Sequence, residues 1–130
     1  MYHRVMVVDD NSTDRYIAEL SIKKFGFANE VIVNDSAVSA LDYLTLEANS
    51  DNLPELIFLD INMPEMSGFE FLDAYDNLPA VVRNNCTVIM LSSSLDSTDV
   101  LRASQNKYVV KFVNKPLVKN VLQQLLTELN

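Results

Sequence analysis

Four short apolar runs in this chain each lead to a polar or charged residue. The runs are residues 5–8, 56–59, 88–91 and 108–113, and they lead to Asp9 and Asp10, to Asp60, to Ser92 and to Lys115. Short runs rich in β-branched residues are typical of buried parallel strands, and open α/β sheets bind ligands outside the carboxyl ends of their strands. We therefore expect three acids, a hydroxyl and a lysine to meet at one sheet edge. Together they have the chemistry of a metal-assisted phosphoryl site.

Strands and helices alternate along the whole chain. Residues 31–33 form a further short apolar run, and helical spacing predicts a helix after each strand. Five such units predict an α/β fold with a five-stranded, doubly wound parallel sheet covered on both faces. Segment 77–85 is expected to be a connection with a short helical turn near 79–82. The first helix is expected to end at Gly26 and to turn these residues toward the sheet: Tyr16, Ile17, Leu20 and Phe25.

The composition restricts the partners and the compartment. Lys and Arg total 10 against 18 Asp and Glu, a net charge of -8 over 130 residues. This acidic balance argues against binding nucleic acid or an anionic membrane surface, both of which need a basic footprint. The single Cys86 excludes an internal disulfide and fits a reducing compartment.

The ends of the chain favour one cytoplasmic domain. Residues 1–4 enter the first strand without the apolar segment of a signal peptide, and no apolar stretch is long enough to span a bilayer. The last predicted helix, with an apolar stripe from Val118 to Leu129, reaches the end of the chain. We therefore expect one domain over residues 1–130 and no effector domain.

Four motifs in this order resemble the receiver domain of two-component response regulators, the fold of the chemotaxis regulator family. They are Val7-Val8-Asp9-Asp10, the segment from Leu59 to Gly68, Leu91-Ser92 and Asn114-Lys115-Pro116. The resemblance covers essentially the whole chain. It implies a flavodoxin-like sheet of strand order 2-1-3-4-5 in a stand-alone, single-domain regulator.

Asp60, alone at the end of a buried run, is the expected phosphoryl acceptor, because carboxylates form acyl phosphates. A carboxylate that attacks an anionic phosphoryl group needs a divalent cation, and Mg²⁺ prefers oxygen ligands. We expect Asp9, Asp10 and Asp60 to bind Mg²⁺, with Asp9 acting directly or through water. The resemblance adds the backbone carbonyl of Asn62.

Lys115 and Ser92 are expected to contact the phosphoryl group, the lysine as a cation and the serine as a hydrogen-bond donor. Lys111 lies inside the last strand run and is expected to face solvent. The resemblance implies a cis peptide at Pro116 and a switch that pairs Ser92 with Phe112.

Gly68 is expected to serve a strained turn before the third helix. Each acid and Ser92 also has a purely structural interpretation. Asp9 and Asp10 could complement a helix dipole, and Asp60 and Ser92 could cap helices. Their coincidence with Lys115 at one edge favours a site.

The resemblance implies a signalling protein rather than an enzyme with its own substrate. Its partners would be a sensor histidine kinase or a histidine phosphotransfer protein, and a downstream protein target whose identity the sequence leaves open. A homodimer that forms on phosphorylation also stays open.

Two alternative functions are disfavoured by the site residues. A receiver-like module that is never phosphorylated is disfavoured, because all five site positions carry usable chemistry. A magnesium-dependent phosphatase of the haloacid dehalogenase type resembles Asp-x-Asp after its first strand. Here Asp60-Ile61-Asn62 follows the third strand, and the Asn62 amide cannot act as the general acid.

Overall fold

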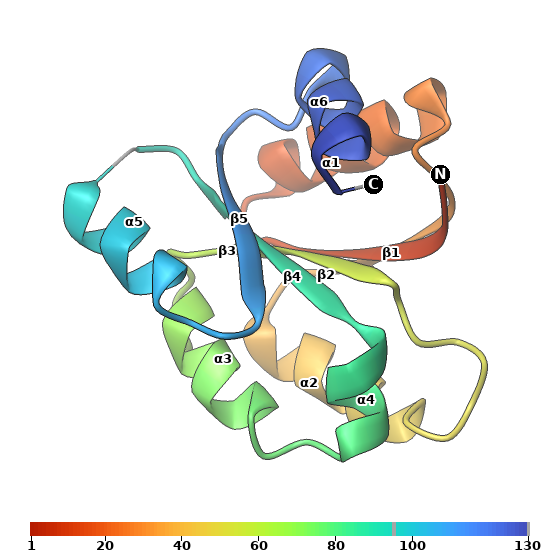
Figure 1. The fold of residues 1–130 in the computed structure, drawn as a ribbon, viewed down its shortest axis with the longest axis vertical. Coiled ribbons are helices and arrows are strands. Elements are labelled where there is room, and N and C mark those ends of the chain that lie inside the picture. The colour runs from red at the N-terminus through yellow and green to blue at the C-terminus, as the bar shows by residue number, and fades with distance from the viewer. Residues whose placement is uncertain (95, 130) are drawn as a thin grey trace.

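The apolar runs form a single parallel sheet in the computed structural model, which describes residues 1–94 and 96–129 (Figure 1). Its strands are β1 (Tyr2–Val8), β2 (Ala28–Asn34), β3 (Leu56–Asp60), β4 (Thr87–Ser92) and β5 (Val109–Asn114). They are arranged in the order β2-β1-β3-β4-β5, which confirms the predicted α/β architecture. Because β1 and β3 lie at the centre, the residues that follow them share one edge.

Helices cover both faces of the sheet, with α1 and α6 on one side and the others on the opposite side (Figure 1). The helices are α1 (Ser12–Phe25), α2 (Ala37–Leu46), α3 (Gly68–Tyr75), α4 (Ala80–Asn85), α5 (Ser97–Ser104) and α6 (Lys119–Leu129). The α4 helix forms within the segment expected to be mainly a connection. It buries Val82 against the core, and this tertiary packing stabilises the short helix.

Two hydrophobic cores hold these layers together. Along β1 the side chains alternate, so that Val5 and Val7 pack with α1 and α6 while Met6 and Val8 pack with α2 and α3. Both faces of a central strand are therefore buried, as the continuous apolar runs predicted. A rigid central sheet fixes the positions of the residues at its carboxyl edge.

The buried face of α1 differs from the expectation. Tyr16 is 63% exposed and Leu20 is 40% exposed, whereas Ala18 and Ile22 are buried. Phe25 packs, partly buried, against the same core as Ala18 and Ile22, as expected, so the expectation is wrong for Tyr16 and Leu20 only. Gly26 ends the helix in the left-handed conformation, with φ of 75°, as expected for a C-terminal glycine.

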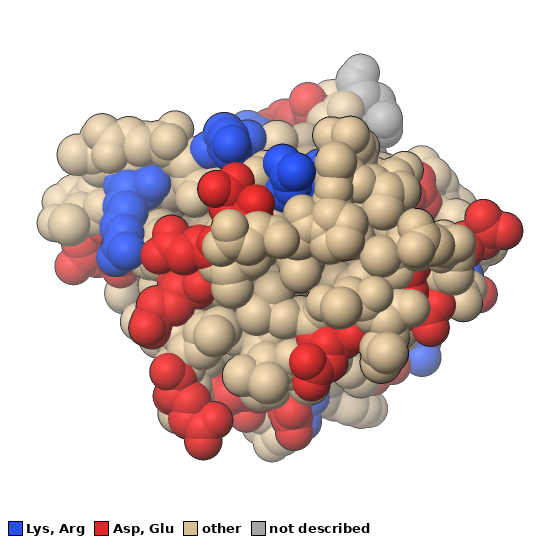
Figure 2. Space-filling model, turned by 90° about the horizontal axis from the view of Figure 1, so that it is seen from below, with Lys and Arg blue, Asp and Glu red and all other residues tan. Residues whose placement is uncertain are grey.

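The surface agrees with the acidic composition. On the face covered by α2, α3 and α4, acidic side chains are spread widely and basic side chains occur at only a few places (Figure 2). Within the described ranges, none of the helices has the length and apolar character that a membrane span requires.

Candidate functional site

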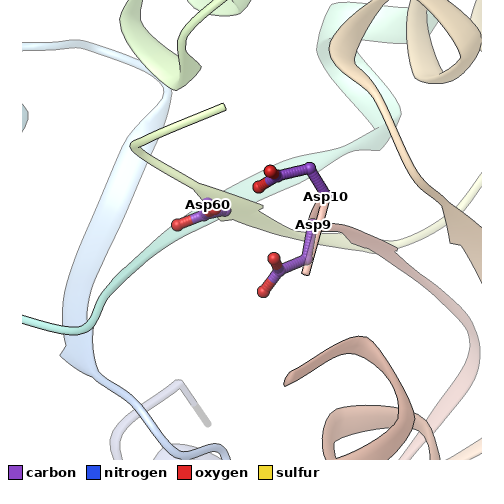
Figure 3. A group of neighbouring side chains, drawn as sticks. All are labelled: Asp9, Asp10 and Asp60. Carbon is purple, nitrogen blue, oxygen red and sulfur yellow. The ribbon is translucent and has the colours of Figure 1, made fainter. Parts of the chain in front are cut away.

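Three carboxylates meet at the carboxyl edge of the sheet. Val8 pairs with Leu59 in the β1–β3 register, so Asp9 and Asp60 come next to each other at the ends of neighbouring strands. Each of Asp9, Asp10 and Asp60 offers an oxygen within 4.8 Å of the others (Figure 3). Asp9 and Asp60 are buried, and Asp10 is exposed. An all-oxygen donor set open to solvent on one side fits a hard divalent cation such as Mg²⁺.

The backbone around Asp9 is fixed by hydrogen bonds on each side. The Asp9 amide donates to the Asn34 carbonyl at 3.1 Å, and the Asn11 amide donates to Asp9 Oδ1 at 2.9 Å. The Arg15 guanidinium donates to the Asp9 carbonyl at 2.8 Å. These bonds tie the first turn of α1 to the end of β1 and leave Asp9 Oδ2 facing the cluster.

Lys115 enters this cluster from the end of β5. Its Nζ lies 2.7 Å from Asp9 Oδ2, 3.1 Å from Asp14 Oδ2 and 3.3 Å from Asp60 Oδ1. Its backbone amide donates to the Ser92 carbonyl at 2.7 Å, and the Lys115–Pro116 peptide is cis, as the resemblance implied. The side chain is only 10% exposed, so this ammonium is almost wholly surrounded by protein.

The pKa values of Asp60 and Lys115 are both raised, which disfavours the charged form of the acid and favours that of the lysine. Desolvation by burial and the neighbouring Asp9 carboxylate together raise the pKa of Asp60 to about 6, against the opposing effect of Lys115. For Lys115, burial disfavours the ammonium, but the hydrogen bond to Asp9 and the charges of Asp60 and Asp9 prevail and raise its pKa. At neutral pH the acids therefore hold a charged lysine, and Asp60 ionises at a cost.

Gly68 is required by a close approach. A Cβ at this position would lie 2.5 Å from the Asp60 carbonyl oxygen, because the Gly68 amide donates to the Ile61 carbonyl at 2.8 Å. This differs from the expected strained turn, since the left-handed residue of the loop is Glu65, with φ of 68°. Ser67 caps α3 through a capping box with Glu70, which fixes where the helix begins.

Ser92 and Phe112 lie beside the cluster on β4 and β5. Asp60 pairs with Leu91, so Ser92 is one residue further along the same edge; it is fully buried, and its Oγ accepts a hydrogen bond from the Ser94 amide at 3.1 Å. Phe112 pairs with Met90 and packs, half-buried, against the core on the α5 side.

Lys111 and Asn62, the remaining positions considered in the sequence, differ in their distance from the acids of the site. The side chain of Lys111 is 40% exposed and pairs with Glu128 of α6, in line with its exclusion from the site. Asn62 is exposed, and its backbone amide donates to the Asp60 carboxylate.

Asp14 is a site residue that the sequence reasoning missed. It reaches Lys115 from the first turn of α1. Its signal in the sequence is its spacing: Asp14 lies four residues before Ala18 and eight before Ile22, on the helix face that meets the sheet. The expectation that Tyr16 and Leu20 face the sheet turned the predicted face of α1 away from Asp14.

Comparison with known proteins places the chain in a family. The response regulator receiver domain model matches residues 5–127. The two-component response regulator ORR1 of rice (Oryza sativa subsp. japonica) is 32% identical over 125 residues, which cover 94% of this chain and 53% of the rice protein. The chain thus spans about half the length of that relative.

Two further matches cover almost all of both chains. The chemotaxis protein CheY homolog of Campylobacter jejuni is 30% identical over 132 residues, covering 95% of this chain and 92% of that protein. The crystal structure of a two-component response regulator from Cytophaga hutchinsonii superposes with a TM-score of 0.89 at 28% identity, covering 97% and 95% of the two chains. This chain belongs to the response regulator receiver domain family of two-component signalling.

Proposed function

We propose that this chain is a receiver that accepts a phosphoryl group on Asp60 with the help of Mg²⁺. The donor would be a phosphohistidine of a sensor histidine kinase or a histidine phosphotransfer protein, and the setting the cytoplasm. One observation carries the proposal: a buried acceptor carboxylate at the end of a central strand lies against two further acids and 3.3 Å from an ammonium.

In the transfer, a carboxylate oxygen of Asp60 forms a bond to phosphorus as the phosphorus–nitrogen bond of the donor breaks. The imidazole nitrogen leaves with the electron pair, and Asp60 becomes an acyl phosphate. Lys115 offsets the negative charge on the phosphoryl oxygens, and Ser92 Oγ–H can donate to one of them after it turns from the Ser94 amide. Attack by water on phosphorus later releases phosphate and restores Asp60.

The residues at the edge fit a magnesium site. Asp9, Asp10 and Asp60 would hold the ion, together with the backbone carbonyl of Asn62. The ion would supply positive charge that reduces the repulsion between the acceptor carboxylate and the phosphoryl group. Asp10 is exposed and would be its ligand on the solvent side.

The phosphoryl group would be detected through Ser92 and Phe112. Movement of the Ser92 hydroxyl toward the phosphoryl group vacates space, and Phe112 turns inward to fill it. The ring packs on the α5 side of the sheet, where a surface pocket of about 180 Å³ adjoins it. The changed surface would act on a protein partner.

The test is to incubate the protein with Mg²⁺ and acetyl phosphate and to measure its intact mass. We expect a gain of one phosphoryl group that is lost in base, and no gain in Asp60→Asn. Beryllofluoride with Mg²⁺ should shift the NMR signals of residues near Phe112. A wild-type protein that gains no mass and shows no such shift would contradict the proposal.

A further inference from the structure

The three carboxylates around Lys115 are not equivalent. Asp9 and Asp60 belong to the cluster that could hold a cation, whereas Asp14 does not. An ammonium has three N–H donors, and three carboxylate oxygens lie within 3.3 Å of Lys115 Nζ. If Asp9 and Asp60 turn to a cation and a phosphoryl group, Asp14 is the partner that stays on the lysine.

The helix keeps Asp14 at this position. Its backbone amide donates to the Asn11 side chain at 2.9 Å, the capping bond of α1. Ala18 and Ile22 follow on the same face and are buried against the sheet, which fixes the rotation of the helix. The Asp14 side chain is 35% exposed, so it reaches Lys115 from the solvent side of the cluster.

We propose that Asp14 is a positioning residue that competes with the phosphoryl group for Lys115 and so weakens the phosphorylated state. This inference rests on the proposed function. The Asp14 carboxylate takes one N–H donor of the ammonium, and its negative charge offsets part of the positive charge of Lys115. Both effects oppose full engagement of Lys115 by a phosphoryl oxygen.

The experiment measures beryllofluoride affinity in the presence of Mg²⁺ by NMR titration of the full chain. Asp14→Asn retains the side-chain shape and the backbone amide of the cap, and it should bind about three- to tenfold more tightly than wild type. Asp14→Glu keeps the charge and should remain near the wild-type affinity. Asp42→Asn removes an exposed acid of α2 and serves as the charge-matched control that should leave the affinity unchanged.

Two further measurements separate competition from a merely structural effect. Raising the ionic strength from about 0.05 M to about 1 M should reduce the gain of Asp14→Asn, since the carboxylate is partly solvated. In a Lys115→Ala background the same substitution should change the affinity less than about twofold, because no ammonium is left to compete for.

The outcomes are distinguishable. A wild-type protein that does not bind beryllofluoride overturns the proposed function and this inference together. If wild type binds but Asp14→Asn binds equally or more weakly, only the competition is overturned. An undiminished gain without Lys115 would also overturn it, because the effect would then not pass through the lysine.

Discussion

The two ends of the sheet use buried charge in different ways. At the amino end, Arg4 of β1 is directly opposite Glu30 of β2, donates to it at 2.9 Å and donates also to the Asp51 carbonyl at 2.8 Å. Glu55 accepts hydrogen bonds from the backbone amides of His3 and Arg4. The Arg4 hydrogen bond lowers the pKa of Glu30. At this end Arg4, Glu30 and Glu55 therefore each have a hydrogen-bond partner.

At the carboxyl end the charges do not balance. The cations there are the Lys115 ammonium and the Arg15 guanidinium. Four acids gather at the same end: Asp9, Asp10, Asp14 and Asp60. Burial and Asp9 raise the pKa of Asp60 to about 6, so the folded chain pays to ionise it. At the amino end the charged side chains are held by hydrogen bonds, whereas the carboxyl end, where we propose that a cation and a phosphoryl group bind, holds acids close together.

The largest effect on the free energy of unfolding is expected from replacing Asp60, whose carboxylate is costly to ionise. Without divalent metal at pH 7.5, Asp60→Asn should raise the free energy of unfolding by about 2–3 kcal/mol, because the buried carboxylate no longer has to ionise. The folded pKa lies above the unfolded value of 3.8, so the stability from protonated Asp60 is present below pH 4 and is lost as pH rises through 6.

The gain of Asp60→Asn should therefore shrink as the pH is lowered from 7 toward 4. Urea unfolding at a series of pH values in EDTA measures it, with Asp42→Asn as the control. A variant that is less stable than wild type at pH 7.5 would show that the carboxyl edge is already balanced.

Substitutions at the amino end of the sheet should lower the free energy of unfolding instead of raising it. Arg4→Met removes a buried donor from Glu30 and from the Asp51 carbonyl and should lower the free energy of unfolding by about 1–3 kcal/mol. Glu30→Gln should cost less, because the Glu30 side chain is 54% exposed. Beryllofluoride affinity should stay at the wild-type value in both variants, and a loss in either would mean that the two edges are coupled.

Stabilisation by Mg²⁺ should depend on the carboxyl end of the sheet and not on the amino end. Mg²⁺ at ten times its dissociation constant should stabilise wild type by about 1.4 kcal/mol, measured as a rise in thermal midpoint. Asp60→Asn should lose most of this rise, and Arg4→Met should retain it. Equal rises in these two variants would place the ion outside the carboxyl edge.

The smallest stability effect is expected at Lys111. Its pair with Glu128 is partly exposed, so Lys111→Ala should change the free energy of unfolding by less than about 1 kcal/mol and leave phosphoryl labelling intact.

Lys115→Ala should retain some labelling but lose the NMR shifts around Phe112. Equal shifts in Lys115→Ala and wild type would remove Lys115 from the switch.

The residues at the strand ends could be predicted from the sequence, whereas other parts of the site could not. Buried parallel strands carry their signal in continuous apolar runs, so the strand ends at Asp9, Asp60 and Ser92 could be read directly from the sequence. The sheet order and the cis peptide at Pro116 came from the family resemblance. The roles of Phe112 and of the Asn62 carbonyl stay predictions.

The helices were harder to predict. The α1 sequence has apolar residues on more than one face, and the sheet selects Ala18 and Ile22 over the larger Tyr16 and Leu20. That choice depends on the space between α1 and α6, which no local pattern contains. Asp14 was missed for this reason, and the close approach that requires Gly68 is likewise visible only in three dimensions.

The most direct test of the central claim locates the phosphoryl group chemically. After incubation with Mg²⁺ and acetyl phosphate, borohydride reduces an acyl phosphate to an alcohol, which turns the acceptor aspartate into homoserine. Peptide mapping should find homoserine at position 60 and unmodified Asp9 and Asp10. Homoserine at either of those positions, or at none of the three in a protein that has gained a phosphoryl group, would contradict Asp60 as the acceptor.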